Sequence, residues 1–101
     1  MSQIQDIYRT RDGRARFTFR FVETGGGMFS SPHVEIDIID APSYGSRSTS
    51  PHHTHRISSE RGGYKVCIGH QDQVRSLSDA RRYAKAWAEE TWKYITRGEA
   101  F

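Results

Sequence analysis

The chain has 101 residues, a formal net charge of +3, a pI of about 9.3 and 35% hydrophobic residues. This length allows one hydrophobic core, so we expect a single domain over residues 1–101. Cys67 is the only cysteine, which excludes an intramolecular disulfide, and no apolar run is long enough for a membrane span. We therefore expect a cytoplasmic protein with no membrane partner.

The N-terminal region predicts a β-hairpin rich in arginine. Asp12-Gly13 is typical of a two-residue type I′ turn, which requires positive φ at both positions. Pairing across that turn places Arg9 opposite Arg16 and Tyr8 opposite Phe17. Side-chain alternation then gathers five arginines on one face, away from the aromatic residues: Arg9, Arg11, Arg14, Arg16 and Arg20. Like charges directly opposite each other favour binding of an anionic partner.

Two segments alternate strictly between apolar and polar residues and predict neighbouring antiparallel strands. These are residues 14–22 and 33–39. Glu35 and Asp37 can then lie across from Arg20 and Thr18, respectively, where they would neutralise Arg20 and shield Arg16. The arginines left without a partner are those nearest the turn, Arg9, Arg11 and Arg14.

Two irregular segments carry candidate contact residues. In residues 23–32, Met28 and Phe29 follow three glycines and form either a partner-binding patch or a contact with the sheet edge. The glycines lack the Lys-Ser/Thr of a phosphate-binding loop, so we assign no nucleotide cofactor. In residues 41–51, Tyr44 and Arg47 offer a stacking ring beside a phosphate-binding cation, unless this loop is simply solvated.

Residues 52–58 and 64–69 predict a second hairpin, with the apolar residues Ile57, Tyr64, Val66 and Ile68 facing the core. A register slip of one residue would exchange its two faces.

Several histidines are candidate ligands for a metal ion. On a strand, His53 and His55 share a face, and His33, His70 or Cys67 would have to complete a zinc site. The alternative is that these histidines form local hydrogen bonds, and we assign no metal. Cys67 is expected in or near the core, and we assign no catalytic residue, because no third orienting group or oxyanion hole is indicated.

The C-terminal segment predicts one long helix, with a serine N-cap, Asp79 in its first turn, Arg97 in its last turn and Gly98 as its stop. Its buried stripe is expected to comprise Ala80, Ala84, Trp87, Ala88, Thr91 and Ile95. We expect exposed ion pairs from Glu89 to Lys85 and to Lys93.

These elements predict an α+β fold: an antiparallel sheet of four or five strands with the C-terminal α-helix packed on one face. Residues 63–69 followed by residues 76–84 are similar in pattern to the last strand and helix of AP2-like and integrase arm-type DNA-binding domains. The similarity covers about a third of the chain and assigns no individual residue.

Two function classes fit the sequence, and neither is an enzyme. The first is a small basic module that contacts phosphates of DNA or RNA through the arginine hairpin and Arg47. The second is a bacterial or mobile-element accessory or inhibitory protein that binds an acidic protein surface, with Met28 and Phe29 as its apolar anchor.

Overall fold

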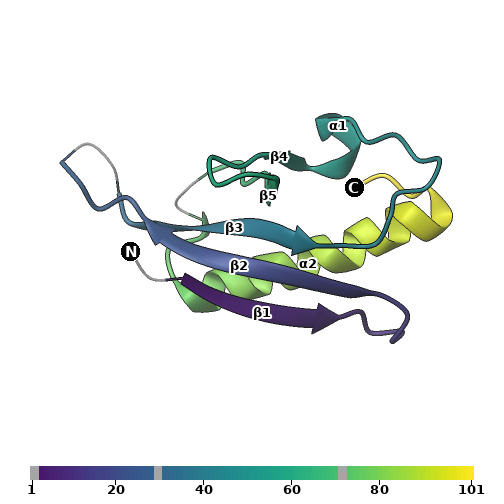
Figure 1. Ribbon diagram of the computed structural model, residues 1–101, viewed down its shortest axis with the longest axis horizontal. Helices are drawn as coiled ribbons and strands as arrows, with labels where there is room; N and C mark the ends of the chain where they lie inside the picture. The colour runs from purple at the N-terminus through teal and green to yellow at the C-terminus, as the bar shows by residue number, and fades with distance from the viewer. Residues whose placement is uncertain (1–2, 29–30, 71–72) are drawn as a thin grey trace.

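The computed structural model describes residues 3–28, 31–70 and 73–101. Its elements are, in chain order, β1 (Gln3–Arg9), β2 (Arg16–Thr24), β3 (His33–Asp40), α1 (Pro51–Thr54), β4 (Arg56–Ser58), β5 (Tyr64–Val66) and α2 (Leu77–Arg97). The strands form one antiparallel sheet in the order β1-β2-β3-β5-β4 (Figure 1). This sheet and the C-terminal helix confirm the expected α+β fold, with five strands.

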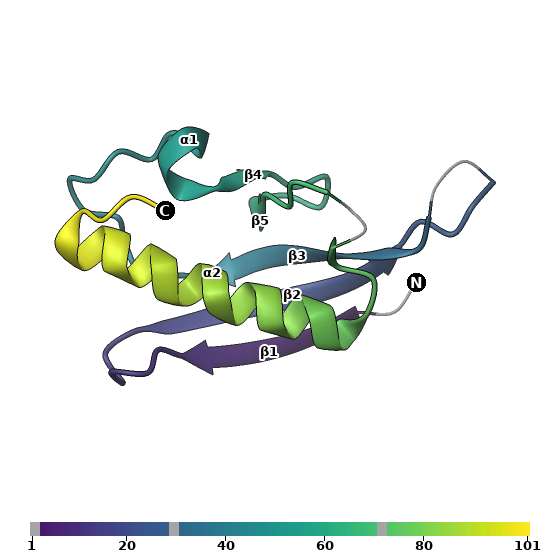
Figure 2. The ribbon, with the colours of Figure 1, turned by 180° about the vertical axis from the view of Figure 1, so that it is seen from behind.

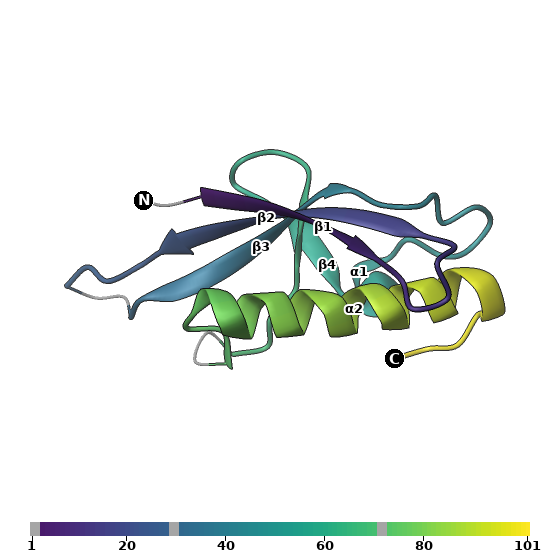
Figure 3. The ribbon, with the colours of Figure 1, turned by 90° about the horizontal axis from the view of Figure 1, so that it is seen from below.

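The helix α2 covers one face of the sheet and leaves the other face open. Figure 2 shows it running across β1, β2 and β3, and Figure 3 shows the two layers edge-on. The side chains of Phe17, Phe19 and Phe21 alternate along β2 and are at most 3% exposed. The ring of Trp87 meets Phe17 and Phe19 edge-on, at centroid distances of 5.8 and 6.0 Å. Aromatic burial against the helix therefore builds the core.

The helix begins and ends at the residues that its sequence signals indicate. The capping serine is Ser76, whose side chain accepts a hydrogen bond from the backbone N–H of Asp79. Gly98 ends the helix in the left-handed conformation, with φ of 73°. The buried stripe differs from the prediction at one position, because Tyr94 is buried in place of Ile95. No helix in the described part of the chain is long and apolar enough to cross a membrane.

The register between β1 and β2 follows the prediction. Tyr8 lies opposite Phe17 and Arg9 opposite Arg16. The register between β2 and β3 differs from the prediction by two residues, because Arg20 lies opposite Asp37 rather than Glu35, and Glu35 lies opposite Val22. The residues that alternate with the buried phenylalanines therefore leave the sheet on the face away from α2.

The predicted strand over residues 52–58 is wrong in its first half. Residues 51–54 form the short helix α1, because Pro51 suits the first helical position and Ser50 precedes it with extended backbone angles. His55 then reverses the chain with φ of 52°, and β4 begins only at Arg56.

The second hairpin places Ile57 on the face opposite to the predicted one. Ile57 pairs with Lys65 and is 39% exposed, so it does not share the face of the buried Val66. Tyr64 is on the same face as Val66 but is 45% exposed, and its ring contacts the guanidinium of Arg56, at 3.9 Å, rather than the apolar core. The prediction that Ile57 and Tyr64 both enter the core is therefore wrong.

Candidate nucleic-acid interface

The turn between β1 and β2 is wider than the predicted two-residue turn. The Thr10 N–H donates to the carbonyl of Ala15 at 3.0 Å, which leaves a loop of four residues between them. Within it, the Gly13 N–H donates to the Thr10 carbonyl at 2.8 Å, and Gly13 alone has positive φ, of 74°. A type I′ turn would also need positive φ at Asp12, so that prediction is wrong.

Asp12 is turned instead toward three donors. Its carboxylate accepts hydrogen bonds from the Arg14 N–H at 2.9 Å, the Thr10 hydroxyl at 2.7 Å and the indole N–H of Trp92 at 2.8 Å. These donors, the Arg14 amide first, lower the pKa of Asp12. The bond to Trp92 fixes the turn against the second half of α2.

Glu89 makes the second connection between the turn and the helix. Its carboxylate accepts hydrogen bonds from the Tyr8 hydroxyl and from the backbone N–H of Arg11. Burial, together with this carboxylate, raises the pKa of Tyr8. The ion pairs predicted from Glu89 to Lys85 and Lys93 are replaced by these contacts, and Lys93 lies 3.5 Å from Glu90 instead. Contacts with the turn have therefore replaced the ion pairs that the helical spacing of Glu89 predicts.

The four arginines nearest the turn have little charge compensation. Arg11 is 80% exposed and its Nε lies 3.7 Å from the Glu89 carboxylate. Arg14 lies over the Trp92 ring, 5.8 Å from its centroid. Arg9 and Arg16 form no ion pair with any residue in the described ranges, although Arg9 donates to the Gly13 carbonyl at 3.3 Å. The turn therefore presents a concentrated positive charge.

The helix adds two cations that the sequence analysis did not assign to this surface. A surface pocket lies between the turn and α2, with Trp92, Lys93, Thr96 and Arg97 on its helix side. The spacing of these four residues places them on one helix face, which is the signal that could have identified them. We call the six cations around this pocket and turn the basic end: Arg9, Arg11, Arg14, Arg16, Lys93 and Arg97.

Arg20 does not belong to the basic end, because it is held in an ion cluster on β3. Its guanidinium lies 2.9 Å from Asp37, which is only 1% exposed. Arg61 binds the same carboxylate at 2.6 Å, and Ser59 donates to it at 2.8 Å. Burial opposes ionisation of Asp37, but these donors outweigh it and lower its pKa. The prediction that a carboxylate of β3 neutralises Arg20 is confirmed, but the carboxylate is that of Asp37 rather than Glu35. The predicted shielding of Arg16 is not seen among the described residues.

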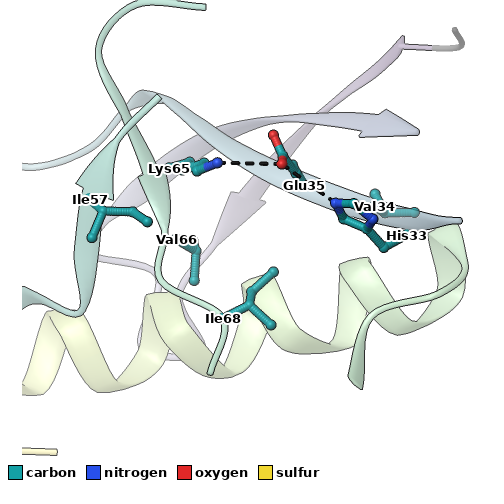
Figure 4. Close-up of a pocket in the computed structure, with 7 residues that line it drawn as sticks. All are labelled: His33, Val34, Glu35, Ile57, Lys65, Val66 and Ile68. Atoms are coloured by element: carbon teal, nitrogen blue, oxygen red, sulfur yellow. Dashed lines mark ion pairs between the residues drawn. The ribbon is translucent and has the colours of Figure 1, made fainter. Parts of the chain in front are cut away.

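Glu35 extends this cluster toward β5. Figure 4 shows its carboxylate between Lys65 and His33, beside a pocket whose apolar lining is Val34, Ile57, Val66 and Ile68. The two ion-pair distances are 3.4 Å to Lys65 and 3.5 Å to His33. Arg61 also donates to Glu35 at 2.6 Å. The expected pairing of Glu35 with β2 is therefore replaced by contacts with the second hairpin. We call Asp37, Glu35, Arg20, Arg61 and Lys65 the Asp37 cluster.

The two loop residues predicted to contact nucleic acid have structural roles instead. Arg47 donates to the carbonyl of Ile95 at 3.2 Å and so satisfies the end of α2. Tyr44 is 7% exposed, with its ring 6.1 Å from that of Tyr94 and beneath Arg56. The expectation of an available stacking ring at Tyr44 is therefore wrong.

Met28 and Phe29 are the loop residues that the sequence predicts as an anchor for a protein partner. Met28 is 89% exposed, as a contact residue would be. Phe29 lies outside the described residues.

Cys67 is exposed, so its predicted place in or near the core is wrong. The reason is local: β5 ends at Val66, and the backbone N–H of Cys67 donates to the carbonyl of His55 at 2.9 Å. His53 and His55 do not share a strand, which removes the geometry on which a zinc site depended. Among the described residues, no three His, Cys, Asp or Glu side chains are grouped as metal ligands.

Comparison of the chain with family models, with curated proteins and with solved structures finds no match. The site is therefore interpreted from its own residues.

Proposed function

We propose that this protein is a non-enzymatic module that binds nucleic acid, and that the basic end contacts the phosphates. The observation that carries the proposal is the contrast in pairing among the arginines. Arg20 is neutralised by a buried carboxylate, whereas Arg9 and Arg16 on the same face form no ion pair with a described residue. Unneutralised guanidinium groups grouped at one place favour a polyanion.

The chemistry of the pocket supports the same partner. A guanidinium over an aromatic ring, as Arg14 is over Trp92, keeps its in-plane N–H donors available for the oxygens of a phosphate. Lys93 and Arg97 add cations along the helix, where each also lies near one carboxylate, at 3.5 Å from Glu90 and 3.6 Å from Glu99. Phosphate contacts of this kind position a protein on nucleic acid without reading its sequence. The cytoplasm expected from the sequence is a compartment that contains such partners.

The test is the salt dependence of binding. We expect the protein to bind a fluorescein-labelled 20-base-pair DNA duplex, or the RNA of the same sequence, in fluorescence anisotropy. If about four phosphates are contacted, affinity falls roughly a hundredfold between 50 and 200 mM salt. The double variant Arg11→Ala/Arg14→Ala lowers the salt slope by about two, since each lost contact removes about one unit.

A matched control removes the same charge elsewhere on the protein. Arg82→Ala/Lys85→Ala also eliminates two cations, but near the start of α2, about 12–16 Å along the helix from Lys93. Its salt slope should stay close to that of the unmodified protein. The proposal is overturned if neither nucleic acid binds at 50 mM salt, or if both double variants lower the slope equally.

A protein partner is the second candidate function, and the exposure of Met28 favours it. An apolar side chain that is 89% exposed on a loop is a suitable anchor for an interface. In this case one stable partner is captured by the protein, and Met28→Ser abolishes the capture while nucleic-acid binding is absent.

A further inference from the structure

The sheet has one long edge that is not covered. The strand order places β1 at one edge and β4 at the other, and β4 has only three residues. In contrast, β1 pairs with β2 over all seven of its residues without a bulge. Figure 1 shows β1 at the outer side of the sheet with no element beyond it.

The backbone of β1 has hydrogen-bonding groups directed outward. Thr10, just after the strand, donates its N–H inward to Ala15. Because inward and outward residues alternate in an antiparallel pair, every second residue of β1 turns its N–H and C=O away from β2. These residues are Gln3, Gln5, Ile7 and Arg9, and together they form a template for one more strand.

This edge lacks most of the features that usually protect an exposed strand. Such strands commonly carry proline, lysine or a bulge, any of which discourages pairing with another chain. The segment Gln3–Arg9 contains no proline and no lysine. It instead exposes 67% of Ile7 and 39% of Ile4. Its one carboxylate, Asp6, is neutralised by Arg81 at 2.6 Å.

The charges beside the edge indicate which chain would pair with it. Arg81 and Lys85 line a small hollow between β1 and α2, together with Asp6, Ile7 and Tyr8. Lys85 is exposed and forms no ion pair with a described residue, whereas Arg82, also near the start of α2, is 75% exposed and lies 2.7 Å from Asp79. A second copy of this chain would bring these cations and the Arg9 side chains close to their counterparts. An acidic chain would neutralise them instead.

We propose that β1 accepts an extended acidic segment of another protein as an added strand. Backbone hydrogen bonds to the four outward residues provide the affinity, and alternate side chains of the segment provide the specificity. Apolar residues of the segment pack beside Ile7 on the open face. Acidic residues lie on the face of α2, where they meet Lys85. This site shares only Arg9 with the basic end and does not depend on the proposed nucleic-acid binding.

The probe is a fluorescein-labelled eight-residue peptide of alternating valine and glutamate, with binding measured by fluorescence anisotropy. Gln5→Pro weakens binding at least tenfold, because it removes an outward N–H and no hydrogen bond to β2. Ile7→Thr weakens it severalfold, whereas Ile39→Thr, at an exposed isoleucine of β3, does not. Far-UV circular dichroism and urea unfolding establish that each variant is folded.

Several results would overturn this proposal. They are absence of peptide binding at about 1 mM, unchanged binding by a folded Gln5→Pro variant, and equal binding of a valine-lysine peptide. A dimer of the unmodified protein that Gln5→Pro converts to a monomer would identify a second copy as the occupant and equally overturn it. Gln5→Pro leaves nucleic-acid binding unchanged, so failure here is distinguishable from failure of the basic end.

Discussion

Arg20 meets a buried carboxylate, whereas Arg16, on the same face of the same strand, meets none among the described residues. The difference lies in what β3 places beside each position. Asp37 is directly opposite Arg20, while the register with β3 shifts between Thr18 and Phe19, before Arg16 is reached. Position in the register, rather than residue type, thus decides whether an arginine stabilises the fold or remains available to a partner.

The Asp37 cluster and the basic end also differ in the elements that they connect. The Asp37 cluster binds the turn after β4 to the middle of the sheet, through Ser59 and Arg61. At the basic end, the hydrogen bonds to α2 are made by the carboxylates of Asp12 and Glu89. The arginine side chains add only the 3.7 Å approach of Arg11 to Glu89 and the contact of Arg14 with the Trp92 ring. We therefore expect stability and binding to respond to different substitutions.

The largest expected effect is the loss of the buried carboxylate at position 37. Asp37→Ala leaves Arg20 and Arg61 without their shared partner, and we expect the free energy of unfolding to fall by about 3 kcal/mol. Urea unfolding measures this change, and nucleic-acid binding at the basic end should persist in the folded fraction. Asp40→Ala is the matched control, because Asp40 is exposed at the end of β3. A loss below about 1 kcal/mol would show that the Asp37 cluster does not stabilise the sheet.

In the unmodified protein, lowering the pH should weaken the Asp37 cluster. Although burial favours the neutral forms, hydrogen bonds from Arg61 and its neighbours lower the pKa of both Asp37 and Glu35. In the unfolded chain these groups take up protons nearer their ordinary pKa values of about 3.9 and 4.3. Their contribution is therefore complete above about pH 5 and is lost as the pH falls through the folded-state pKa values.

Urea unfolding between pH 7 and pH 3 tests this sign. The free energy of unfolding should decrease with acid, and the decrease should be shallower in Asp37→Ala, which lacks one of the titrating groups. Asp12 and Asp79, whose pKa values are also lowered, account for part of the remaining slope. Equal slopes in the two proteins would contradict a role for Asp37 in acid sensitivity.

The smallest expected effect on stability comes from giving Arg16 a carboxylate as its cross-strand partner. Arg9→Glu places a carboxylate opposite Arg16, and a cross-strand ion pair of this kind stabilises by about 0.2–1 kcal/mol. Nucleic-acid binding should weaken more than in Arg9→Gln, since Arg16 becomes neutralised as well. The two variants are compared by urea unfolding and by anisotropy at 50 mM salt. Identical binding by both variants would exclude Arg16 from the interface.

Local patterns in the sequence were sufficient to predict much of the fold. Alternation around Phe17, Phe19 and Phe21 predicts β2 and its buried face, and the serine and Gly98 signals bound the long helix. Alternation and antiparallel pairing also predict that a carboxylate of β3 meets Arg20, but they do not determine the register, so the partner is Asp37 instead of Glu35. These features depend on residues close in sequence or on the regular pairing of two neighbouring strands.

The remaining features depend on contacts between distant segments. Glu89 is taken from its expected helix partners by the first turn, and Asp12 finds Trp92 eighty residues away. Arg61 was not identified because its loop reaches back to β3 only once the second hairpin is in place. Tyr44, placed in a solvated loop by composition, is buried against Tyr94 for the same reason.

The two tryptophans occupy two contrasting surroundings, which gives the protein two internal fluorescent reporters. Trp87 is 4% exposed and its indole N–H donates to the carbonyl of Thr54, so its emission should be blue-shifted and insensitive to iodide. Trp92 donates to a carboxylate beside a guanidinium, where emission should be red-shifted and readily quenched. In a Trp87→Phe variant, the emission spectrum would therefore follow the contact between the turn and α2 directly.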